Sequence, residues 1–287
     1  MILASEDYLT ACAFDASSLA VLSDLDTPVW RREFETLERI QAEFVRANPH
    51  CDNYLWPRDP LHCGTRVWEY PYVYHNVKNW LSPAKATGRR ILDLGSGVTF
   101  FPFAVSRLGC DVLAVDADVV SAASFRNARE SISAAPGSVE LIVSDGRSLA
   151  VDRRSIDCLY CISVLEHIPS FEEVIEECAR VIKPGGRLIL TVDIDLSGTF
   201  ALGPADFASL QQKLSEHFET AGPIRAIHPA ALLTSENVQS QNISRAKRFQ
   251  RAARSAASPV YRFIRGRRPY IASIPVVATY GTTMVRG

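Results

Sequence analysis

The chain lacks a hydrophobic run long enough to cross a membrane, and it lacks the marks of a secreted protein. No stretch of its 287 residues approaches the roughly 18 consecutive apolar residues that a spanning helix needs. The N-terminal sequence MILASED has no basic residue and starts no long apolar run, so we expect no signal peptide. The cysteines number seven, an odd count at scattered positions, which does not suit a disulfide framework. These absences predict a cytoplasmic protein with reduced thiols.

The chain also lacks internal repeats, and what remains is an ordinary globular composition. Hydrophobic residues make up 47% of the chain and charged residues 22%, enough to bury a full core. The first informative segment is residues 90–99, where an apolar run ends at Asp93 and a Gly-Ser-Gly turn follows at 95–97. Glycines at a strand-to-helix turn let a ligand approach the bare backbone. The next apolar run ends in Asp116, an acid placed to accept ribose hydroxyls. The pattern predicts a nucleoside-cofactor site.

Two cofactors fit these features, NAD and S-adenosylmethionine. The dinucleotide fingerprint has a third glycine near position 100, where this chain has Val98, Thr99 and Phe100. Further along, residues 141–145 predict a third strand ending in an acid, and residues 155–168 a fourth strand running into a helix. Residues 181–191 predict a helix end, a turn and a fifth strand. The order of these pieces favours S-adenosylmethionine.

Five motifs carry a family resemblance over roughly residues 86–195: DLGSG at 93–97, VDAD at 115–118, SDG at 144–146, SVLEHI at 163–168 and KPGG at 183–186. In order and spacing the series resembles the class I S-adenosylmethionine-dependent methyltransferases, apart from Thr99, where many members carry a glycine. The resemblance implies S-adenosyl-L-methionine as cofactor and an α/β fold, a Rossmann-like seven-stranded sheet with helices on both faces and an N-terminal helical and aromatic lid. The cofactor-binding residues that it implies are Asp93, Gly95, Ser96, Gly97, Asp116, Ala117, Asp145, Gly146 and Ser163.

The same resemblance divides the chain into two parts. Residues 1–85 are expected to form the helical cap and lid, and residues 86–287 the cofactor-binding domain, with a basic insertion at about 235–270. Apolar spacing predicts a helix over 28–47, whereas prolines at 57, 60 and 71 argue against one long helix over 50–80. After the fifth strand we expect a helix over 204–218, a sixth strand at 222–227 and a reversed seventh strand at 274–285.

Two groups of residues are candidates for contact with a methyl acceptor. Trp68, Glu69 and Tyr72 place a carboxylate among aromatics near a cationic sulfonium, although the aromatics could equally pack the lid onto the sheet. His167 could remove a hydroxyl proton, and Asp195, with Asp193 beside it, competes for the same catalytic role. The alternative is that His167 orders the helix start and that alignment in a dry pocket supplies the rate.

We expect no metal site. The pairs His50-Cys51 and His62-Cys63 match no ordinary zinc spacing. Cys158 and Cys161 lie three apart on a predicted strand, so their side chains point to opposite faces and cannot share an ion or a bridge.

These features predict methyl transfer to a hydroxyl of a small-molecule, glycan or lipid-linked acceptor. The Pro-Pro-Tyr signature of many amide and nucleobase N-methyltransferases is absent after the fourth strand, where Ser163-Val164-Leu165-Glu166 stands. Two alternatives stay open: an RNA or DNA methyltransferase, and a catalytically inactive S-adenosylmethionine-binding scaffold.

The net charge of −1 is the sum of two oppositely charged parts of the chain. Residues 238–287 contain ten Lys and Arg and no Asp or Glu, so this segment carries +10 and the rest carries −11. Residues 245–268 predict a basic amphipathic helix, which suits an anionic membrane surface at the inner face of a membrane. Nucleic acid is disfavoured because aromatics here are few. The remaining interpretation is a helix docked on the acidic remainder of the protein or on the second subunit of a homodimer.

Overall fold

The structure is a computed structural model that describes residues 13–47, 59–81, 86–117, 119–198, 202–238 and 276–287. The predicted basic helix over 245–268 and the pair His50-Cys51 lie outside these residues. In the described part of the chain, no helix is both long enough and apolar enough to cross a membrane.

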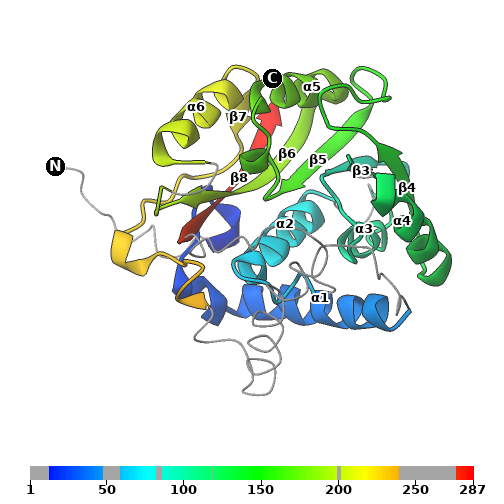
Figure 1. The fold of residues 1–287 in the computed structure, drawn as a ribbon, viewed down its shortest axis with the longest axis horizontal. Coiled ribbons are helices and arrows are strands. Elements are labelled where there is room, and N and C mark those ends of the chain that lie inside the picture. Colours follow the sequence, from blue (N-terminus) through cyan, green and yellow to red (C-terminus); the bar gives the residue numbers. More distant parts are fainter. Residues whose placement is uncertain (1–12, 48–58, 82–85, 118, 199–201, 239–275) are drawn as a thin grey trace, which may run out of the picture.

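A single mixed sheet organises the described residues (Figure 1). Its strand order is β1-β8-β6-β5-β2-β3-β4, and β7 also pairs with β8. The strands are β1 (Ser18–Leu19), β2 (Arg90–Leu94), β3 (Asp111–Asp116), β4 (Ser138–Val143), β5 (Ile156–Ile162), β6 (Ile182–Asp195), β7 (Phe218–Thr220) and β8 (Val277–Arg286). Strands β2 to β6 run parallel, whereas β8 is antiparallel to β6. The five predicted parallel strands and the reversed last strand are confirmed.

The strand predicted at 222–227 is wrong. The strand that pairs beside β8 is β7, which comes earlier in the chain. Pro223 has no N–H to give to a ladder. Its carbonyl instead accepts the N–H of Ser17 at 2.9 Å, and Arg225 N donates to Ser17 O at 3.1 Å, which leaves a single isolated bridge.

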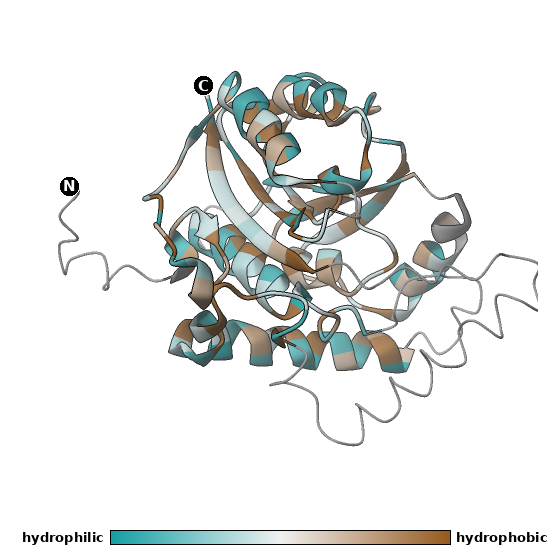
Figure 2. Cartoon of the chain, turned by 60° about the vertical axis from the view of Figure 1, so that its left-hand side comes forward, coloured by the Kyte–Doolittle hydropathy of each residue, from teal (hydrophilic) through white to brown (hydrophobic). Residues whose placement is uncertain are grey.

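Helices cover both faces of the sheet, as predicted (Figure 1). They are α1 (Pro28–Ala47), α2 (Arg66–Trp80), α3 (Phe101–Ser106), α4 (Val119–Ser131), α5 (Phe171–Val181) and α6 (Pro204–Ser215). Helices α1, α2 and α3 lie on one side of the sheet, and α5 and α6 lie on the other. Along α1 hydrophobic and hydrophilic residues recur at helical spacing (Figure 2). Trp30, Leu37 and Phe44 are buried, and the other large apolar side chains of this helix are partly buried.

Side chains alternate between the two faces along each strand. On β2, Ile91 belongs to the core under α1 to α3, and Leu92 to the core under α5 and α6. On β5, Cys158 and Cys161 fall into the same two cores, and both are free buried thiols whose pKa burial raises. The interpretation of these cysteines as core thiols on opposite faces is confirmed.

Helix α2 begins only at Arg66, so the described residues 59–80 do not form one long helix, but it runs through Pro71, one of the three prolines expected to interrupt a helix there. A proline inside a helix leaves the carbonyl four residues earlier without its donor, here the carbonyl of Val67. The indole N–H of Trp30 on α1 donates to that carbonyl at 2.8 Å. A long-range side chain therefore supplies the hydrogen bond that the local sequence lacks.

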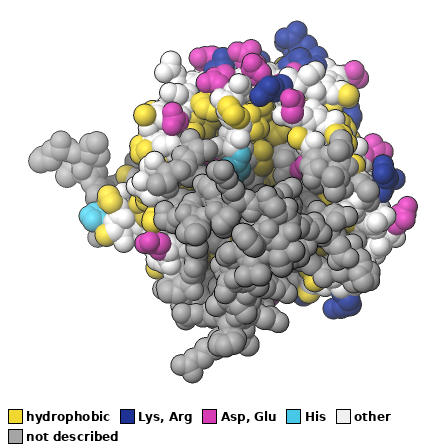
Figure 3. All heavy atoms as spheres, in the orientation of Figure 1, with side chains coloured by type: hydrophobic (Ala, Val, Ile, Leu, Met, Phe, Trp, Pro, Cys, Tyr) yellow, Lys and Arg dark blue, Asp and Glu magenta, His cyan; other side chains and the backbone are white. Residues whose placement is uncertain are grey.

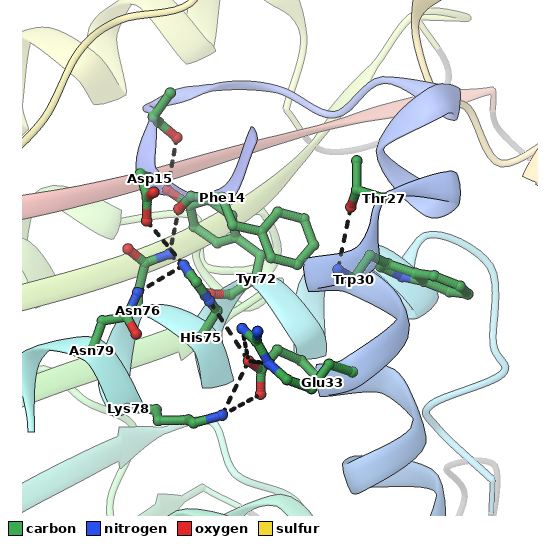
Figure 4. A network of polar contacts seen from close by, with 12 residues as sticks. Phe14, Asp15, Thr27, Trp30, Glu33, Tyr72, His75, Asn76, Lys78 and Asn79 are labelled. Atoms are coloured by element: carbon green, nitrogen blue, oxygen red, sulfur yellow. Dashed lines mark hydrogen bonds and ion pairs between the residues drawn. The ribbon is translucent and has the colours of Figure 1, made fainter. Parts of the chain in front are cut away.

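A buried polar network joins α1, α2 and the residues before β1 (Figure 4). Glu33, fully buried, accepts from Lys78 Nζ at 3.0 and 3.1 Å. His75 Nε2 lies 2.9 Å from Asp15 Oδ1 and 2.8 Å from Asn79 Nδ2. Burial alone would raise the pKa of Glu33, but its hydrogen bonds, with Lys78 among the donors, lower it to about 2. We call these five residues the Glu33 network.

The predicted cap packs on the sheet instead of standing apart from it. Trp68 and Val73 of α2 lie in the same buried cluster as Tyr160 of β5 and Ile189 of β6. The division at residue 85 and the lid function stay predictions.

Candidate functional site

The site is built where the carboxyl ends of the parallel strands meet. The strand order reverses between β2 and β5, and in open α/β sheets ligands bind at such a switch point. Hydrophobic side chains gather in the upper half of the face in Figure 3, inside a rim of acidic and basic side chains.

The glycine turn predicted at 95–97 follows β2 directly. Gly95 and Ser96 both donate their backbone N–H to Val115 O, at 2.8 and 2.9 Å, which fixes the turn against β3. Gly95 has φ 77° and Gly97 has φ 53°, the left-handed region that glycine adopts at little cost. A Cβ at position 95 would collide with the side chain of Val164. The turn therefore has room for backbone and not for side chains.

Asp116 lies beside this turn at the end of β3. Its Oδ2 accepts the N–H of Gly97 at 2.8 Å, which orients the carboxylate across the glycine turn. Ala117, the next residue, is exposed. After β4, Asp145 is exposed and its Oδ1 accepts the N–H of Arg147 at 3.1 Å, while Gly146 is buried with φ 84°. The residues predicted for ribose and adenine thus follow neighbouring strands at one edge.

Asp93 and Ser163 lie under the glycine turn. Asp93 is buried on β2, and its burial, with the Asp116 charge nearby, raises its pKa to about 8. Ser163 follows β5 with φ 50°, which is uncommon outside glycine. Its buried hydroxyl makes no hydrogen bond of good geometry in the described part of the chain, although it lies close enough to the carboxyls of Glu166 and Asp193 to lower the pKa of both. A buried hydroxyl with incomplete hydrogen bonding, next to Val164, which contacts the Gly95 turn, fits a site that a polar ligand completes.

A second set of polar groups lies at the ends of β5, β6 and β8, against α2. Arg66 Nη1 donates to both oxygens of Glu69, at 2.8 and 2.7 Å, and Glu69 is fully buried. Thr191 of β6 donates to Glu69 Oε2 at 3.0 Å. We call Arg66, Glu69, Glu166, Thr191, Asp193 and Thr279 the polar cluster.

Asp193 is the partly exposed carboxylate of the polar cluster. Thr279 of β8 donates to its Oδ1 at 2.5 Å, and Arg66 lies 3.7 Å from its Oδ2. Burial, with the Glu69 charge, raises the pKa of Asp193 to about 6. Glu166 Oε1 accepts the backbone N–H of Asp193 at 3.2 Å. Burial and the Asp193 charge raise the pKa of Glu166 to about 8, so this carboxyl holds a proton at neutral pH.

The two residues predicted to be catalytic lie in different surroundings. His167 ends a short 3-10 helix (Leu165–His167) and keeps part of its surface exposed, while the protein that packs around the rest of the ring, together with the Arg66 charge, lowers its pKa below 6.5. Asp195 is buried, and its Oδ1 accepts the N–H and the hydroxyl of Ser197, at 2.7 and 2.5 Å. The Asp195 carboxylate thus bonds the turn that follows β6, whereas the Asp193 side chain is partly exposed. A catalytic role of Asp195 stays a prediction.

Of the three predicted substrate residues, two are packing residues. The Trp68 and Tyr72 rings stack at 4.6 Å and contact Gly281 of β8, with nearly no exposed surface. Trp68 Nε1 donates to Asp24 Oδ2 at 2.9 Å. Of the two interpretations of these aromatic residues, the geometry supports packing of α2 onto the sheet. Glu69 alone of the three belongs to the polar cluster.

His62 lies away from both sets of polar groups. Its Nδ1 is 2.6 Å from Asp59 Oδ1 and its Nε2 is 3.1 Å from Glu38 Oε1. In the ranges that the structure describes, no group of three or more His, Cys, Asp or Glu is arranged to hold a metal ion.

Sequence reasoning missed Arg66 and Thr279. Arg66 carried one local signal, its i,i+3 spacing to Glu69 on a helix face. Thr279 carried none, because its hydrogen bond reaches a residue 86 positions away.

Comparison with known proteins adds independent evidence on the family of this chain. The model of a methyltransferase domain family matches residues 92–190. A ubiquinone biosynthesis O-methyltransferase of Xanthomonas campestris pv. campestris (strain B100) is 31% identical over 194 residues, covering 66% of this chain and 75% of the relative. The corresponding protein of Xanthomonas axonopodis pv. citri (strain 306) is 29% identical over the same shares.

Solved structures share the fold at lower identity. The [4+2]-cyclase SpnF is 18% identical with a TM-score of 0.52, over 88% of this chain and 94% of that one. A Haemonchus contortus N-methyltransferase, solved with S-adenosylhomocysteine and phosphomonomethylethanolamine, is 18% identical with a TM-score of 0.52, over 88% of this chain and 60% of that one. The motif series, the sheet order and the sequence relatives agree: this chain belongs to the class I S-adenosylmethionine-dependent methyltransferases.

Proposed function

We propose that this methyltransferase transfers the methyl group of S-adenosylmethionine to a hydroxyl oxygen of a small-molecule acceptor. The observation that carries the proposal is the polar cluster at the carboxyl end of β6, next to the glycine turn. A hydroxyl loses its proton when it is methylated, and a side chain of suitable pKa speeds that transfer. Asp193, with a pKa of about 6, and His167, with a pKa below 6.5, can both accept a proton at neutral pH. The names of the Xanthomonas relatives support oxygen as the acceptor atom.

We also propose that S-adenosylmethionine binds at the glycine turn. Asp93, Gly95, Ser96 and Gly97 would hold the methionine part, and Asp116 and Ala117 the ribose. Asp145 and Gly146 would hold the adenine, and Ser163 would line the floor near the sulfonium, beside the carboxyls of Glu166 and Asp193. When bound, the cofactor supplies an electrophilic methyl group. Binding also excludes water, which strengthens every electrostatic interaction in the site.

The direct test is methylation of a defined probe. We would use a short-chain ubiquinol that lacks one O-methyl group, and the same ring with an amino group in place of the free hydroxyl. Formation of S-adenosylhomocysteine with the hydroxyl probe and not with the amino probe is expected. Methylation of the amino probe alone would overturn the choice of oxygen. Binding of S-adenosylmethionine in calorimetry with no methylation of either probe would favour the scaffold alternative.

A lipid-linked acceptor is the finer part of the proposal, and it rests on sequence. Residues 245–268 contain nine Lys and Arg and no acidic residue, which favours an anionic membrane surface. Co-sedimentation with anionic vesicles at low salt, lost at high salt and absent with neutral vesicles, is expected. Retention of RNA in place of vesicles would favour the nucleic-acid alternative, and protection of the segment in a homodimer would make it an interface.

A further inference from the structure

We propose that Asp193, and not His167, accepts the proton of the methyl acceptor, with Glu166 and Arg66 as its positioning residues. The inference rests on the proposed function and names the base of that same site.

Asp193 is the reachable carboxyl of the polar cluster. Its side chain is 16% exposed, whereas that of Glu69 is 0% exposed and Glu166 as a residue is 3% exposed. Its Oδ1 is held by the hydroxyls of Thr279 at 2.5 Å and Thr65 at 3.3 Å. These donors come from β8 and from the residue before α2, so two separate elements fix the orientation of the carboxylate. The same contacts leave Oδ2 on the side of Arg66, at 3.7 Å.

Glu166 holds the backbone of Asp193, since its Oε1 accepts the Asp193 N–H at 3.2 Å. Burial and the Asp193 charge raise the pKa of Glu166 to about 8, so the two carboxyls do not both ionise easily. Asp193 has the lower pKa of the two and is therefore the carboxyl that ionises first as pH rises.

The charges around Asp193 and His167 act on both groups with the same sign. Arg66 of α2 lowers the pKa of both groups, and Glu69 of α2 raises the pKa of both. Burial separates them, because it raises the pKa of the Asp193 carboxyl and lowers the pKa of the His167 imidazole. Asp193 is also the group whose orientation is fixed, by the Thr279 and Thr65 hydroxyls and by Glu166 on its backbone N–H.

The transfer balances without a further reagent. The acceptor's oxygen forms a bond to the methyl carbon, and the carbon–sulfur bond breaks with its electron pair left on sulfur. The O–H proton passes to a carboxylate oxygen of Asp193. One positive and one negative charge disappear, and the products are a neutral ether, a neutral thioether and a neutral carboxylic acid.

The test compares three variants on the demethylated ubiquinol probe. Asp193→Asn is expected to lower kcat by about 10²–10⁴-fold with unchanged calorimetric affinity for S-adenosylmethionine. The wild-type kcat should rise with pH through an ionisation near 6, and His167→Gln should keep that rise. Thr279→Val removes a donor that lowers the pKa of Asp193, so the rise should move to higher pH. Asp152→Asn, exposed and distant from the site, is the matched control with unchanged kcat.

A second readout needs no acceptor. Carboxyl ¹³C spectra of aspartate-labelled protein should show one signal that titrates near pH 6 and is missing in Asp193→Asn. An Asp193 signal that titrates at the ordinary value near 3.8, or an Asp193→Asn variant as active as wild type, would overturn the inference. Loss of the rise in His167→Gln would assign the base to His167. Failure of the wild type to methylate the probe would overturn the proposed function itself, which separates the two failures.

Discussion

The glycine turn and the polar cluster lie at the same edge of the sheet but are built in different ways. The turn is made by backbone donors: the N–H groups of Gly95 and Ser96 bond the Val115 carbonyl of β3, and that of Gly97 bonds the Asp116 carboxylate at the end of the same strand. The polar cluster is made by side chains from four elements, and its hydrogen bond between Thr191 and Glu69 spans 122 positions. If the turn holds the cofactor and the polar cluster contacts the acceptor, as we propose, the two parts should respond differently to substitution, because a backbone turn tolerates little change and a set of side chains can be replaced one by one.

The largest effect is expected at the turn. Gly95→Val should abolish measurable S-adenosylmethionine binding in calorimetry, because a side chain there meets Val164 and forces a left-handed φ that costs about 1–2 kcal/mol by itself. Gly88→Ala is the control, since Gly88 has a similar φ of 78° and nothing within 4 Å of its added Cβ. Tight binding by Gly95→Val would show that the turn is not the cradle.

The second effect is expected at the Glu33 network, which holds α2, the helix that also carries Arg66 and Glu69 of the polar cluster. The pKa of Glu33 in the folded protein, about 2, lies below the ordinary value of 4.5, so its ionised carboxylate stabilises the fold above pH 4.5, and this contribution is lost as pH falls toward 2. Glu33→Gln should lower the free energy of unfolding by roughly 3 kcal/mol at pH 7, and by less at pH 4. Denaturant unfolding at both pH values measures this, with the exposed Glu35→Gln on the same helix as control. Equal losses at both pH values would contradict the ionised network.

Asp116 is a side chain within the backbone-built turn, so its replacement should have a smaller effect than that of Gly95. Asp116→Ala should weaken S-adenosylmethionine binding by about 1.5–3 kcal/mol, the range for hydrogen bonds to a charged group. Asp111→Ala, at the opposite end of β3, should leave the affinity unchanged. An unchanged affinity in Asp116→Ala would remove this residue from the ribose site.

The smallest effect concerns the hydrogen bond that lets α2 pass through Pro71. Trp30→Phe should cost about 1 kcal/mol of unfolding free energy beyond its packing change, because the Val67 carbonyl loses its donor. Pro71→Ala restores a backbone N–H for the same carbonyl, so the cost of Trp30→Phe should shrink in that background. Additive costs in the double-mutant cycle would mean that the two donors do not substitute for each other.

The sequence predicted the parts of the molecule that local patterns determine. Five parallel strands, the glycine turn and the reversed last strand follow from apolar runs, glycines and the motif series. The exceptions have a common cause. Pro71 stays inside a helix because Trp30, far along the chain, supplies a donor, and residues 222–227 form no strand because Pro223 bonds Ser17 instead. The polar cluster was partly predicted, through Glu69. Its member Thr279 could not be predicted from sequence, because its hydrogen bond to Asp193 joins residues that only the tertiary structure brings together.

Strand β8 also determines when the protein can finish folding. It is the last strand in chain order, yet it lies inside the sheet, where β6 pairs with one side and β1 and β7 with the other. While the chain is being synthesised, β6 has an unpaired edge, the rings of Trp68 and Tyr72 lack Gly281, and Asp193 lacks Thr279. An open strand edge is prone to aggregation. Strands that are far apart in the sequence, as β6 and β8 are, also pair slowly. A chain that lacks residues 277–286 should therefore leave the β6 edge open and Asp193 without the Thr279 hydroxyl, so it should aggregate and be inactive.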